Sequence, residues 1–336
     1  MSNVKLIAFL KFRICSKITD IQPSAAADGF DNKPMNIYKL KILLWLTAVF
    51  SLSMATAAQQ AQPQPTLPPT VENHKLNSKL MAREMPYRVI VPVKYKSEKQ
   101  RRYAVIYLLH GLTGQFDDWT NRTKLADYAA KYDYIIVTPE GNNGWYSDSG
   151  SVPNDKYESY IVQELIPEID KNYRTISDKN HRAVAGLSMG GYGSIKFGLK
   201  YPEKFALVGS FSGALMAASL TEKMLGNGWK VLTDSIVSVY GAEDSPTRAA
   251  NDVFKLVREM PAEKAKTLPF IYLDCGTEDG LIAANREFSA LLIEKKIPHE
   301  SRELPGKHDW IFWDAQVQEF LKLSEKFISR ADAKMN

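Results

Sequence analysis

Short apolar runs alternate with longer amphipathic stretches along most of the chain. Continuous apolar runs, which are typical of strands buried on both faces, fall at residues 103–109, 134–138, 182–185, 205–210 and 270–274, with a weaker candidate at 299–303. Residues 87–92 alternate apolar and polar side chains, as an edge strand does. Helical periodicity lies between these runs, at 123–131, 158–173, 191–201, 283–295 and 315–330. The alternation predicts an α/β fold with a mostly parallel central sheet and helices on both faces.

Residues 212–268 interrupt this alternation with the longest gap between predicted strands. We interpret the segment as a small helical cap inserted over the sheet. The alternative is a peripheral helical excursion that contacts no ligand. Ligand sites in such sheets lie at the carboxyl ends of the strands, so a cap at that edge would border the site.

The amino-terminal region has the layout of an export signal. From Met35 onward, two lysines precede an apolar stretch at 42–54, and four small residues follow it. This order predicts a secretory signal peptide at 35–58 and an exported protein, either periplasmic or secreted. A membrane anchor is the alternative, but the apolar stretch is shorter than the roughly 20 residues that span a bilayer. Residues 1–34 are then a start-site extension or an unusually long basic region of the signal.

A single folded domain is predicted after this signal. Residues 59–77 begin with a stretch rich in Gln and Pro and are expected to form a flexible linker. Residues 78–330 contain no internal repeat and are expected to form one domain. Cys15 precedes the signal, so Cys275 is the only cysteine of the mature chain and no intramolecular disulfide is expected.

The positive charge of the chain lies mostly outside the predicted domain. The chain has 43 basic and 38 acidic residues, of which 36 and 35 follow residue 58. A nearly neutral body lacks the basic surface of a nucleic-acid-binding protein, so no nucleic-acid partner is expected. No membrane span is expected once the signal is removed, and the sequence indicates no particular oligomeric state.

A G-x-S-x-G motif follows the predicted strand 182–185. Its central residue, Ser188, lies between Gly186 and Gly190, and a predicted helix begins directly afterwards. In this strand–turn–helix context the serine occupies a sharp, strained turn, and side chains at the two glycines would collide with the neighbouring strand and helix. The motif therefore predicts that Ser188 is a nucleophile.

A nucleophilic serine needs a histidine base and a carboxylate that orients it. Of the two histidines that follow Ser188, we favour His308, in a loop after the last predicted strand, over His299, which begins that strand in a charged context. For the carboxylate, Asp274, Glu278 and Asp279 compete at the end of the strand 270–274. We favour Asp279, which lies far enough beyond the strand to reach His308, with Glu278 in reserve and Asp274 in a structural role.

An oxyanion hole is expected from two backbone N–H groups. One belongs to Met189, which directly follows the nucleophile, and the other to Leu112 in the loop after the strand 103–109. His110 begins that loop, and we expect its ring to hold the loop in place. No second ligand lies near His110 at metal-binding spacing, so no metal site is predicted.

Aromatic residues gather in the same loops. Trp119, Trp145 and Tyr146 lie beside polar residues, and Trp310 follows His308. We interpret these four as exposed contacts to a carbohydrate or aryl group. The alternative is that they pack in the core.

Taken in order, these motifs resemble those of the esterase D-like (putative esterase) family of α/β hydrolases. That family includes S-formylglutathione hydrolases, tributyrin, feruloyl and acetylxylan esterases, and mycolyltransferases. The matching segments are 107–119, 141–149, 160–173, 185–205, 273–281 and 306–313. The resemblance implies an α/β-hydrolase fold, a triad of Ser188, Asp279 and His308, and no metal or other cofactor.

The sequence thus predicts an exported serine carboxylesterase. It would hydrolyse an acyl or aryl ester, either a small molecule or one linked to carbohydrate, through an acyl-enzyme. Two alternatives stay open. One is an acyltransferase that passes the acyl group to a sugar hydroxyl, and the other is a non-catalytic binding protein on a hydrolase scaffold.

Overall fold

The computed structural model of the chain describes residues 70–226 and 229–328. The predicted extension at 1–34, the signal peptide at 35–58 and the first part of the predicted linker lie outside the described residues, as do Cys15 and residues 329 and 330 at the end of the predicted domain. Within the described residues, no helix is both long and apolar enough to cross a membrane.

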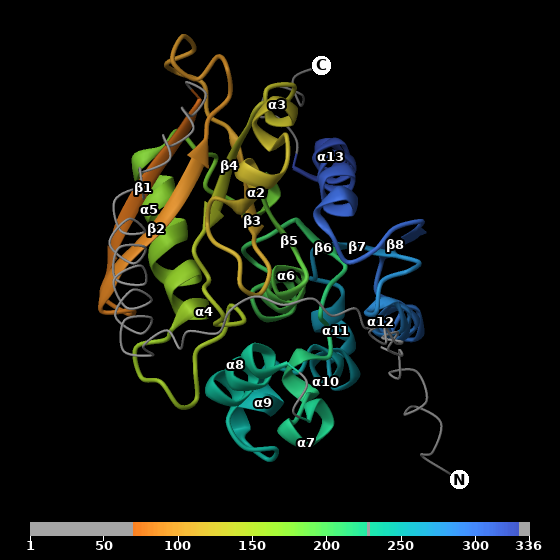
Figure 1. Cartoon of the computed structure of the whole chain (residues 1–336). Coiled ribbons are helices and arrows are strands. Elements are labelled where there is room, and N and C mark those ends of the chain that lie inside the picture. The colour runs from red at the N-terminus through yellow and green to blue at the C-terminus, as the bar shows by residue number, and fades with distance from the viewer. Residues whose placement is uncertain (1–69, 227–228, 329–336) are drawn as a thin grey trace, which may run out of the picture. The chain divides into compact units, whose positions relative to one another are not determined.

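The described strands form one mixed sheet of eight, in the order β1-β2-β4-β3-β5-β6-β7-β8 (Figure 1). From β4 to β8 all neighbouring strands are parallel, whereas β1 pairs with β2, and β2 with β4, in antiparallel register. The mostly parallel sheet predicted from the apolar runs is confirmed. The bounds are β1 Val71–Ser78, β2 Arg83–Ile90, β3 Ala104–Leu109, β4 Tyr134–Pro139, β5 Arg182–Leu187, β6 Leu207–Phe211, β7 Phe270–Gly276 and β8 His299–Leu304.

The amino-terminal edge of the sheet differs from the prediction. The stretch predicted as an edge strand is β2, which is paired on both sides, and the edge is β1, which begins at Val71 inside the predicted linker. Polar residues dominate β1, so it carries no apolar pattern. Its pairing with β2 and local contacts hold it there: the His74 ring stacks on Tyr87 at 5.5 Å and shares a 2.8 Å hydrogen bond with the Tyr173 hydroxyl.

Helices cover both faces of the sheet because the strand side chains alternate between two cores. In β3, Val105, Tyr107 and Leu109 join the core under α6 and α12, while Ile106 and Leu108 join the core under α2, α3 and α13. Figure 1 shows α12 and α13 on opposite sides of β7 and β8. The helices outside the insertion are α2 Asp118–Arg122, α3 Leu125–Ala129, α4 Tyr157–Ser159, the π-helical η1 Tyr160–Leu165, α5 Ile166–Asn172, the short η2 Lys179–His181, α6 Met189–Lys200, α12 Ile282–Glu294 and α13 Trp310–Phe327.

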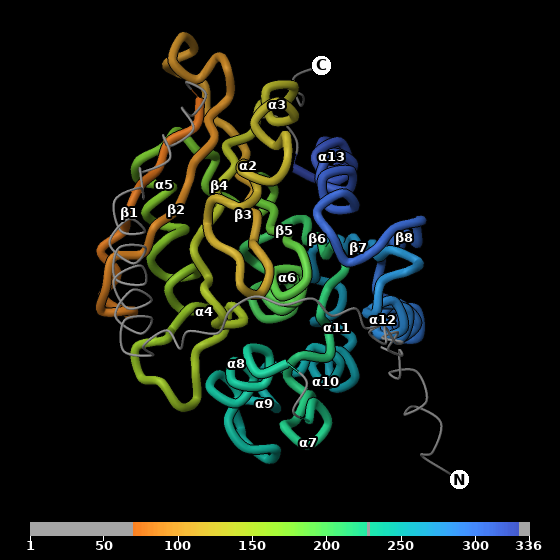
Figure 2. Tube along the Cα trace, viewed as in Figure 1, coloured from red at the N-terminus to blue at the C-terminus, as the bar shows by residue number. Residues whose placement is uncertain are grey.

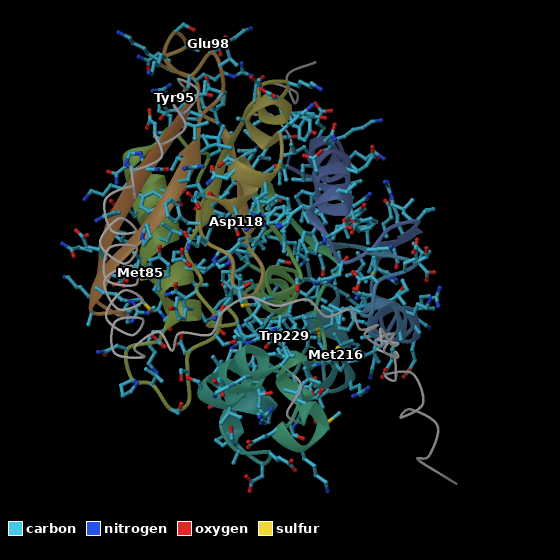
Figure 3. All side chains as sticks on the ribbon, in the orientation of Figure 1. Met85, Tyr95, Glu98, Asp118, Met216 and Trp229 are labelled. Atoms are coloured by element: carbon cyan, nitrogen blue, oxygen red, sulfur yellow. The ribbon has the colours of Figure 1, made fainter. Side chains whose placement is uncertain are left out.

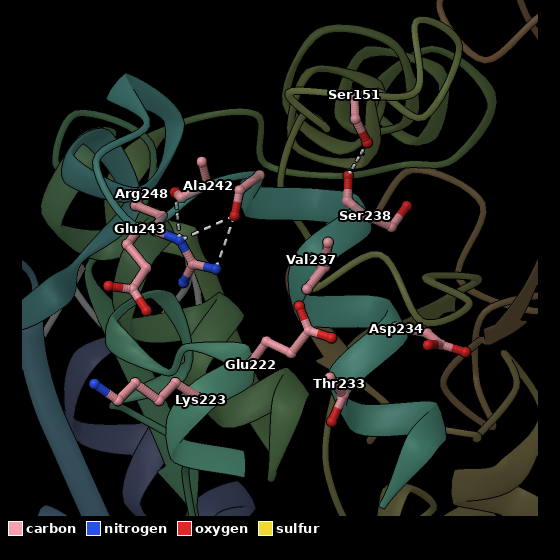
Figure 4. Close-up of a pocket in the computed structure, with 11 residues that line it drawn as sticks. Ser151, Glu222, Lys223, Thr233, Asp234, Val237, Ser238, Ala242, Glu243 and Arg248 are labelled. Carbon is pink, nitrogen blue, oxygen red and sulfur yellow. Dashed lines mark hydrogen bonds between the residues drawn. The ribbon is translucent and has the colours of Figure 1, made fainter. Parts of the chain in front are cut away.

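The insertion at 212–268 is helical, as predicted. It contains η3 Ala217–Ser219, α7 Glu222–Leu225, α8 Lys230–Tyr240, α9 Pro246–Asn251, α10 Val253–Arg258 and α11 Ala262–Ala265. In the trace of Figure 2, α7, α8 and α9 lie together below α6. They border a cleft of about 1020 Å³, in which the Arg248 guanidinium donates to backbone carbonyls that include those of Gly241 and Ala242 (Figure 4).

The loop between β4 and α4 ties the insertion to the sheet. Trp145 Nε1 donates to Ser235 Oγ of α8 at 3.0 Å, and the Gly150 N–H donates to the Val239 carbonyl at 2.9 Å. The loop thus lies between α8 on one side and α6 on the other.

A buried ion-pair cluster joins α4 to α6. Glu158 lies 2.9 Å from the Lys196 Nζ and 2.6 Å from the Lys200 Nζ, and it accepts a hydrogen bond from the Tyr201 hydroxyl. Burial raises the pKa of Glu158, but the two lysines outweigh burial and lower it to about 2. Burial also lowers the pKa of Lys196 to about 8, against the opposing charge of Glu158. At neutral pH the pair is therefore ionised on both sides.

We predict that Glu158→Gln lowers the free energy of unfolding by about 3 kcal/mol at pH 7, because it leaves the Lys196 charge buried without its partner. A carboxylate with a lowered pKa stabilises the fold above its unfolded value and loses that contribution as pH falls through its folded value. The difference between wild type and variant should therefore shrink as pH falls from 4.5 towards 2.

Urea unfolding across this pH range measures the difference, with Glu203→Gln, an exposed carboxylate near the same cluster, as the matched control. The prediction is contradicted if the difference in free energy of unfolding between wild type and Glu158→Gln stays constant down to pH 2. It is also contradicted if that difference is no larger than the one for the control variant.

Candidate active site

Ser188 occupies a sharp turn between β5 and α6. Its backbone has φ 53° and ψ −113°, a conformation that residues other than glycine rarely adopt. Three hydrogen bonds hold it there. The Ser188 N–H donates to the Phe211 carbonyl at 2.9 Å, and the Ser188 carbonyl accepts from Tyr192 and Ala214, both at 3.0 Å. The strain of the turn is thus fixed by the adjacent strand and by the first turn of the helix.

The glycines on either side of Ser188 permit this geometry. A Cβ at Gly190 would lie 2.4 Å from the Leu109 carbonyl oxygen and 2.7 Å from that of His110. A Cβ at Gly186 would lie 2.6 Å from the Gly190 carbonyl carbon. Each contact is with backbone, which cannot move aside. The steric argument made from the motif therefore holds in the structure.

His308 lies within hydrogen-bond distance of both Ser188 and Asp279. His308 Nε2 is 3.0 Å from Ser188 Oγ, and His308 Nδ1 is 2.8 Å from Asp279 Oδ2. The ring of His308 packs edge-on against Trp313 at 4.9 Å. The structure thus brings together the three residues that the sequence reasoning selected, from the turn after β5 and the loops after β7 and β8.

Asp279 is held as a carboxylate beneath His308. Its side chain is buried, and its Oδ1 accepts a 2.8 Å hydrogen bond from the Leu281 N–H. Burial raises the pKa of Asp279, but the hydrogen bonds from His308 and Leu281 outweigh burial and hold it below the ordinary aspartate value. The negative charge therefore persists at neutral pH, and it faces the His308 Nδ1.

The competing candidates lie elsewhere. Asp274 is buried at the end of β7, and burial raises its pKa well above the ordinary value. Glu278 is an exposed partner of Lys307 at 3.7 Å. His299 lies in β8, where its ring contacts Ser289 Oγ at 2.9 Å. The hydrogen bonds of the described residues thus connect none of these side chains to Ser188.

The two predicted oxyanion donors both lie close to Ser188. Met189 follows it at the start of α6, and the loop of Leu112 passes close by, since a Cβ at Gly111 would lie 3.5 Å from the Ser188 Cβ. Within the described residues, neither the Leu112 nor the Met189 N–H donates to a backbone carbonyl or a side chain. Both are available to an incoming oxygen.

A cleft of about 320 Å³ opens beside Ser188. Trp310 and Trp313 form one wall, with their rings edge-to-face at 5.3 Å, and the Arg122 guanidinium lies over the Trp310 ring at 5.6 Å. Trp229, labelled in Figure 3, lines the same cleft from just before α8 and is 58% exposed. The insertion therefore contributes a side chain to this cleft. None of Ser188, His308 and Asp279 lines the larger cleft of Figure 4.

The predicted exposure of three aromatic residues is wrong. Trp119, Trp145 and Tyr146 are buried, because their polar atoms find partners inside the fold. Trp119 Nε1 donates to the Leu109 carbonyl, the Tyr146 hydroxyl donates to the His110 carbonyl, and Trp145 donates to α8. Of the four predicted contacts, Trp310 lines the cleft. Sequence reasoning missed Trp229, whose only signal was a large aromatic side chain directly after the sequence Gly226-Asn227-Gly228.

Comparison with known proteins gives a consistent result. The family model described as "putative esterase" matches residues 78–323. An acetyl esterase of Caldicellulosiruptor saccharolyticus is 28% identical over 249 residues, which cover 71% of this chain and 92% of that protein. An endo-1,4-beta-xylanase/feruloyl esterase of Xylanibacter ruminicola is 38% identical over 125 residues, 34% of this chain and 17% of that protein. The solved structure of a ferulic acid esterase, 28% identical, superposes with a TM-score of 0.65 over 76% of this chain and 98% of that one.

Proposed function

We propose that this chain, which belongs to the putative esterase family of α/β hydrolases and is a carboxylic ester hydrolase, cleaves carbohydrate-linked acyl or aryl esters. In this proposal the protein acts outside the cytoplasm, and Ser188, His308 and Asp279 form its catalytic triad. The observation that carries the proposal is the unbroken chain of hydrogen bonds from Asp279 through His308 to Ser188, at the mouth of a cleft lined by aromatic side chains.

The geometry supports acyl-enzyme chemistry. His308 Nε2 accepts the Ser188 Oγ proton as the oxygen attacks the ester carbonyl, and the Asp279 carboxylate stabilises the imidazolium that forms. The carbonyl oxygen becomes an oxyanion and accepts hydrogen bonds from the Leu112 and Met189 N–H groups. His308 then protonates the departing alcohol. In the second half, His308 takes a proton from water, the water oxygen attacks the acyl-enzyme, and Ser188 recovers its proton as the acid leaves.

Carbohydrate-linked substrates are supported by the cleft and by the relatives. Trp229 and Trp310 offer flat apolar surfaces, and Asp118 and Arg122 offer polar groups that can bond hydroxyls. The similar proteins carry names that refer to acetyl and feruloyl esters, and one of them is also named as a xylanase.

Hydrolysis is favoured over transfer of the acyl group to a sugar hydroxyl because the similar proteins described above are named as esterases. Incubation of a p-nitrophenyl ester with a sugar acceptor distinguishes the two: free acid as the main product supports hydrolysis, and a new sugar ester supports transfer.

We predict that Ser188→Ala lowers kcat on p-nitrophenyl acetate by about 10³-fold or more, since no other group supplies the nucleophile. Ser97→Ala, an exposed serine distant in sequence, is the control and should keep wild-type turnover. A fluorophosphonate probe should label wild type and the control but not Ser188→Ala. Substantial turnover by a folded Ser188→Ala variant would overturn the triad.

We predict that Trp229→Ala raises KM about 3- to 10-fold for an acetylated xylo-oligosaccharide, and changes KM for p-nitrophenyl acetate less than twofold. The reason is that loss of one aromatic contact costs about 0.5–1.5 kcal/mol only for a substrate long enough to reach it. Trp229→Phe, which keeps a ring, should recover most of the loss. Equal effects on both substrates, or no hydrolysis of the sugar ester by wild type, would contradict the carbohydrate link and leave the esterase assignment intact.

Export is tested on the protein made in its own cell. Amino-terminal sequencing of the mature protein should begin at about residue 59, with the protein recovered outside the cytoplasm. An uncleaved chain retained in the cytoplasm would refute the export proposal.

A further inference from the structure

The peptide between Gly111 and Leu112 is held from its carbonyl side. The Gly111 carbonyl oxygen lies 2.8 Å from His110 Nδ1 and also accepts the Gly114 N–H at 3.0 Å. This carbonyl and the Leu112 N–H belong to one planar trans peptide, so they point in opposite directions. Whatever fixes the carbonyl towards the His110 ring therefore fixes the N–H in the opposite direction, away from that ring.

The His110 ring is itself fixed by a buried carboxylate. Glu140, directly after β4, places Oε1 3.1 Å from His110 Nε2 and accepts the Gly141 and Asn142 N–H groups on the same oxygen, at 3.0 and 2.6 Å. The other carboxylate oxygen of Glu140, Oε2, accepts the Phe116 N–H at 3.1 Å. Phe116 lies towards the end of the loop after β3, which His110 begins. Burial raises the pKa of Glu140, but its bonds to His110 and to these N–H groups outweigh burial and hold it below the ordinary value.

The proton on His110 Nδ1 follows from its partner. A carbonyl oxygen can only accept, so Nδ1 must carry the hydrogen that it donates to Gly111. His110 Nε2 faces both Glu140 Oε1 and the Gly141 N–H, the latter at 2.9 Å. A carboxylate can only accept, so the contact with Glu140 is a hydrogen bond when Nε2 also carries a hydrogen, and the Gly141 N–H then donates to Glu140 Oε1. With a hydrogen on each ring nitrogen, His110 links the Glu140 carboxylate to the Gly111 carbonyl.

The ring cannot turn away from this position. Its side chain is 1% exposed, the Tyr146 ring packs against it at 5.8 Å, and the Tyr146 hydroxyl donates to the His110 carbonyl at 3.0 Å. Lys196 in turn donates to the Tyr146 carbonyl at 2.7 Å. Both the ring and the backbone of His110 are therefore anchored to the loop after β4.

We propose that Glu140 is a positioning residue of the oxyanion hole: acting through His110, it holds the Gly111–Leu112 peptide so that the Leu112 N–H faces the oxyanion that forms on Ser188. Glu140 is buried and does not line the cleft beside Ser188, so its contribution is made through His110 when charge develops on the carbonyl oxygen. The inference rests on the proposed esterase mechanism and adds to it a carboxylate outside the triad.

Glu140→Gln is the principal test. The amide keeps the shape of the side chain but turns one acceptor into a donor and removes the charge that faces His110. We expect kcat on p-nitrophenyl acetate to fall about 10- to 100-fold with KM within twofold of wild type, because loss of a whole oxyanion donor costs about 10²- to 10³-fold and this change misaligns one. The ratio of kcat/KM for an oxoester to that for the matching thionoester should fall as well, since sulfur gains less from an aligned N–H.

Glu164→Gln is the matched control. Glu164 also accepts two backbone N–H groups, those of Lys79 and Leu80, but at the amino-terminal edge of the sheet. It should lose stability without any change in kcat or in the oxoester-to-thionoester ratio. If Glu140 acts through His110, the kcat of the double variant Glu140→Gln/His110→Asn should be no lower than that of the single variant with the lower kcat.

Two results overturn the inference. One is a folded Glu140→Gln enzyme with wild-type kcat and thionoester ratio, and the other is a kcat loss that adds fully to that of His110→Asn. If Glu140→Gln does not fold, Glu140→Asp, which keeps the charge and shortens its reach, is held to the same criteria. Failure of the triad itself is recognised separately, because it leaves Ser188→Ala active.

Discussion

The close approach of α6 to the end of β3 is the constraint on which the site depends. The backbone at Gly190 lies so near the Leu109 and His110 carbonyls that no side chain fits between them. This contact sets the sharp turn at Ser188, whose strain of about 1–3 kcal/mol is offset by the burial of α6 in the core. The same contact brings the loop after β3 beside Ser188, so one close packing arrangement positions both the proposed nucleophile and the proposed oxyanion hole.

Parallel strands explain why residues far apart in sequence meet here. The loops after β3, β5, β7 and β8 all leave the same edge of the sheet, which gathers Leu112, Ser188, Asp279 and His308 in one place. The order of motifs along the chain, together with the topology that the apolar runs predict, is enough to select Ser188, Asp279 and His308 from the sequence. Asp279 was preferred to Asp274 because of its reach beyond the strand, and the structure shows Asp274 closed off inside the sheet.

Sequence patterns were less informative where partners lie in other segments. β1 is polar and became a strand only because β2 offers it a free edge, so its composition suggested a linker. Trp119, Trp145 and Tyr146 occur among polar residues, a context shared by exposed binding loops and by loops folded inward. What decides between these is whether the polar atoms find acceptors, here the carbonyls of Leu109 and His110 and the hydroxyl of Ser235, and that is a property of the tertiary fold.

The buried aromatic residues acquire a different meaning from their place in the loop after β4. Two buried carboxylates flank that loop: Glu140, at its start, contacts His110 of the loop after β3, and Glu158, in α4 at its end, pairs with Lys196 of α6. Tyr146 lies between the two, since its hydroxyl donates to His110 and its carbonyl accepts from Lys196. The loop therefore connects α6 to the loop after β3 with buried charged and polar contacts. Because a buried charge that loses its partner is costly, these contacts resist displacement, and the geometry of the proposed site is fixed by the same interactions that stabilise the fold.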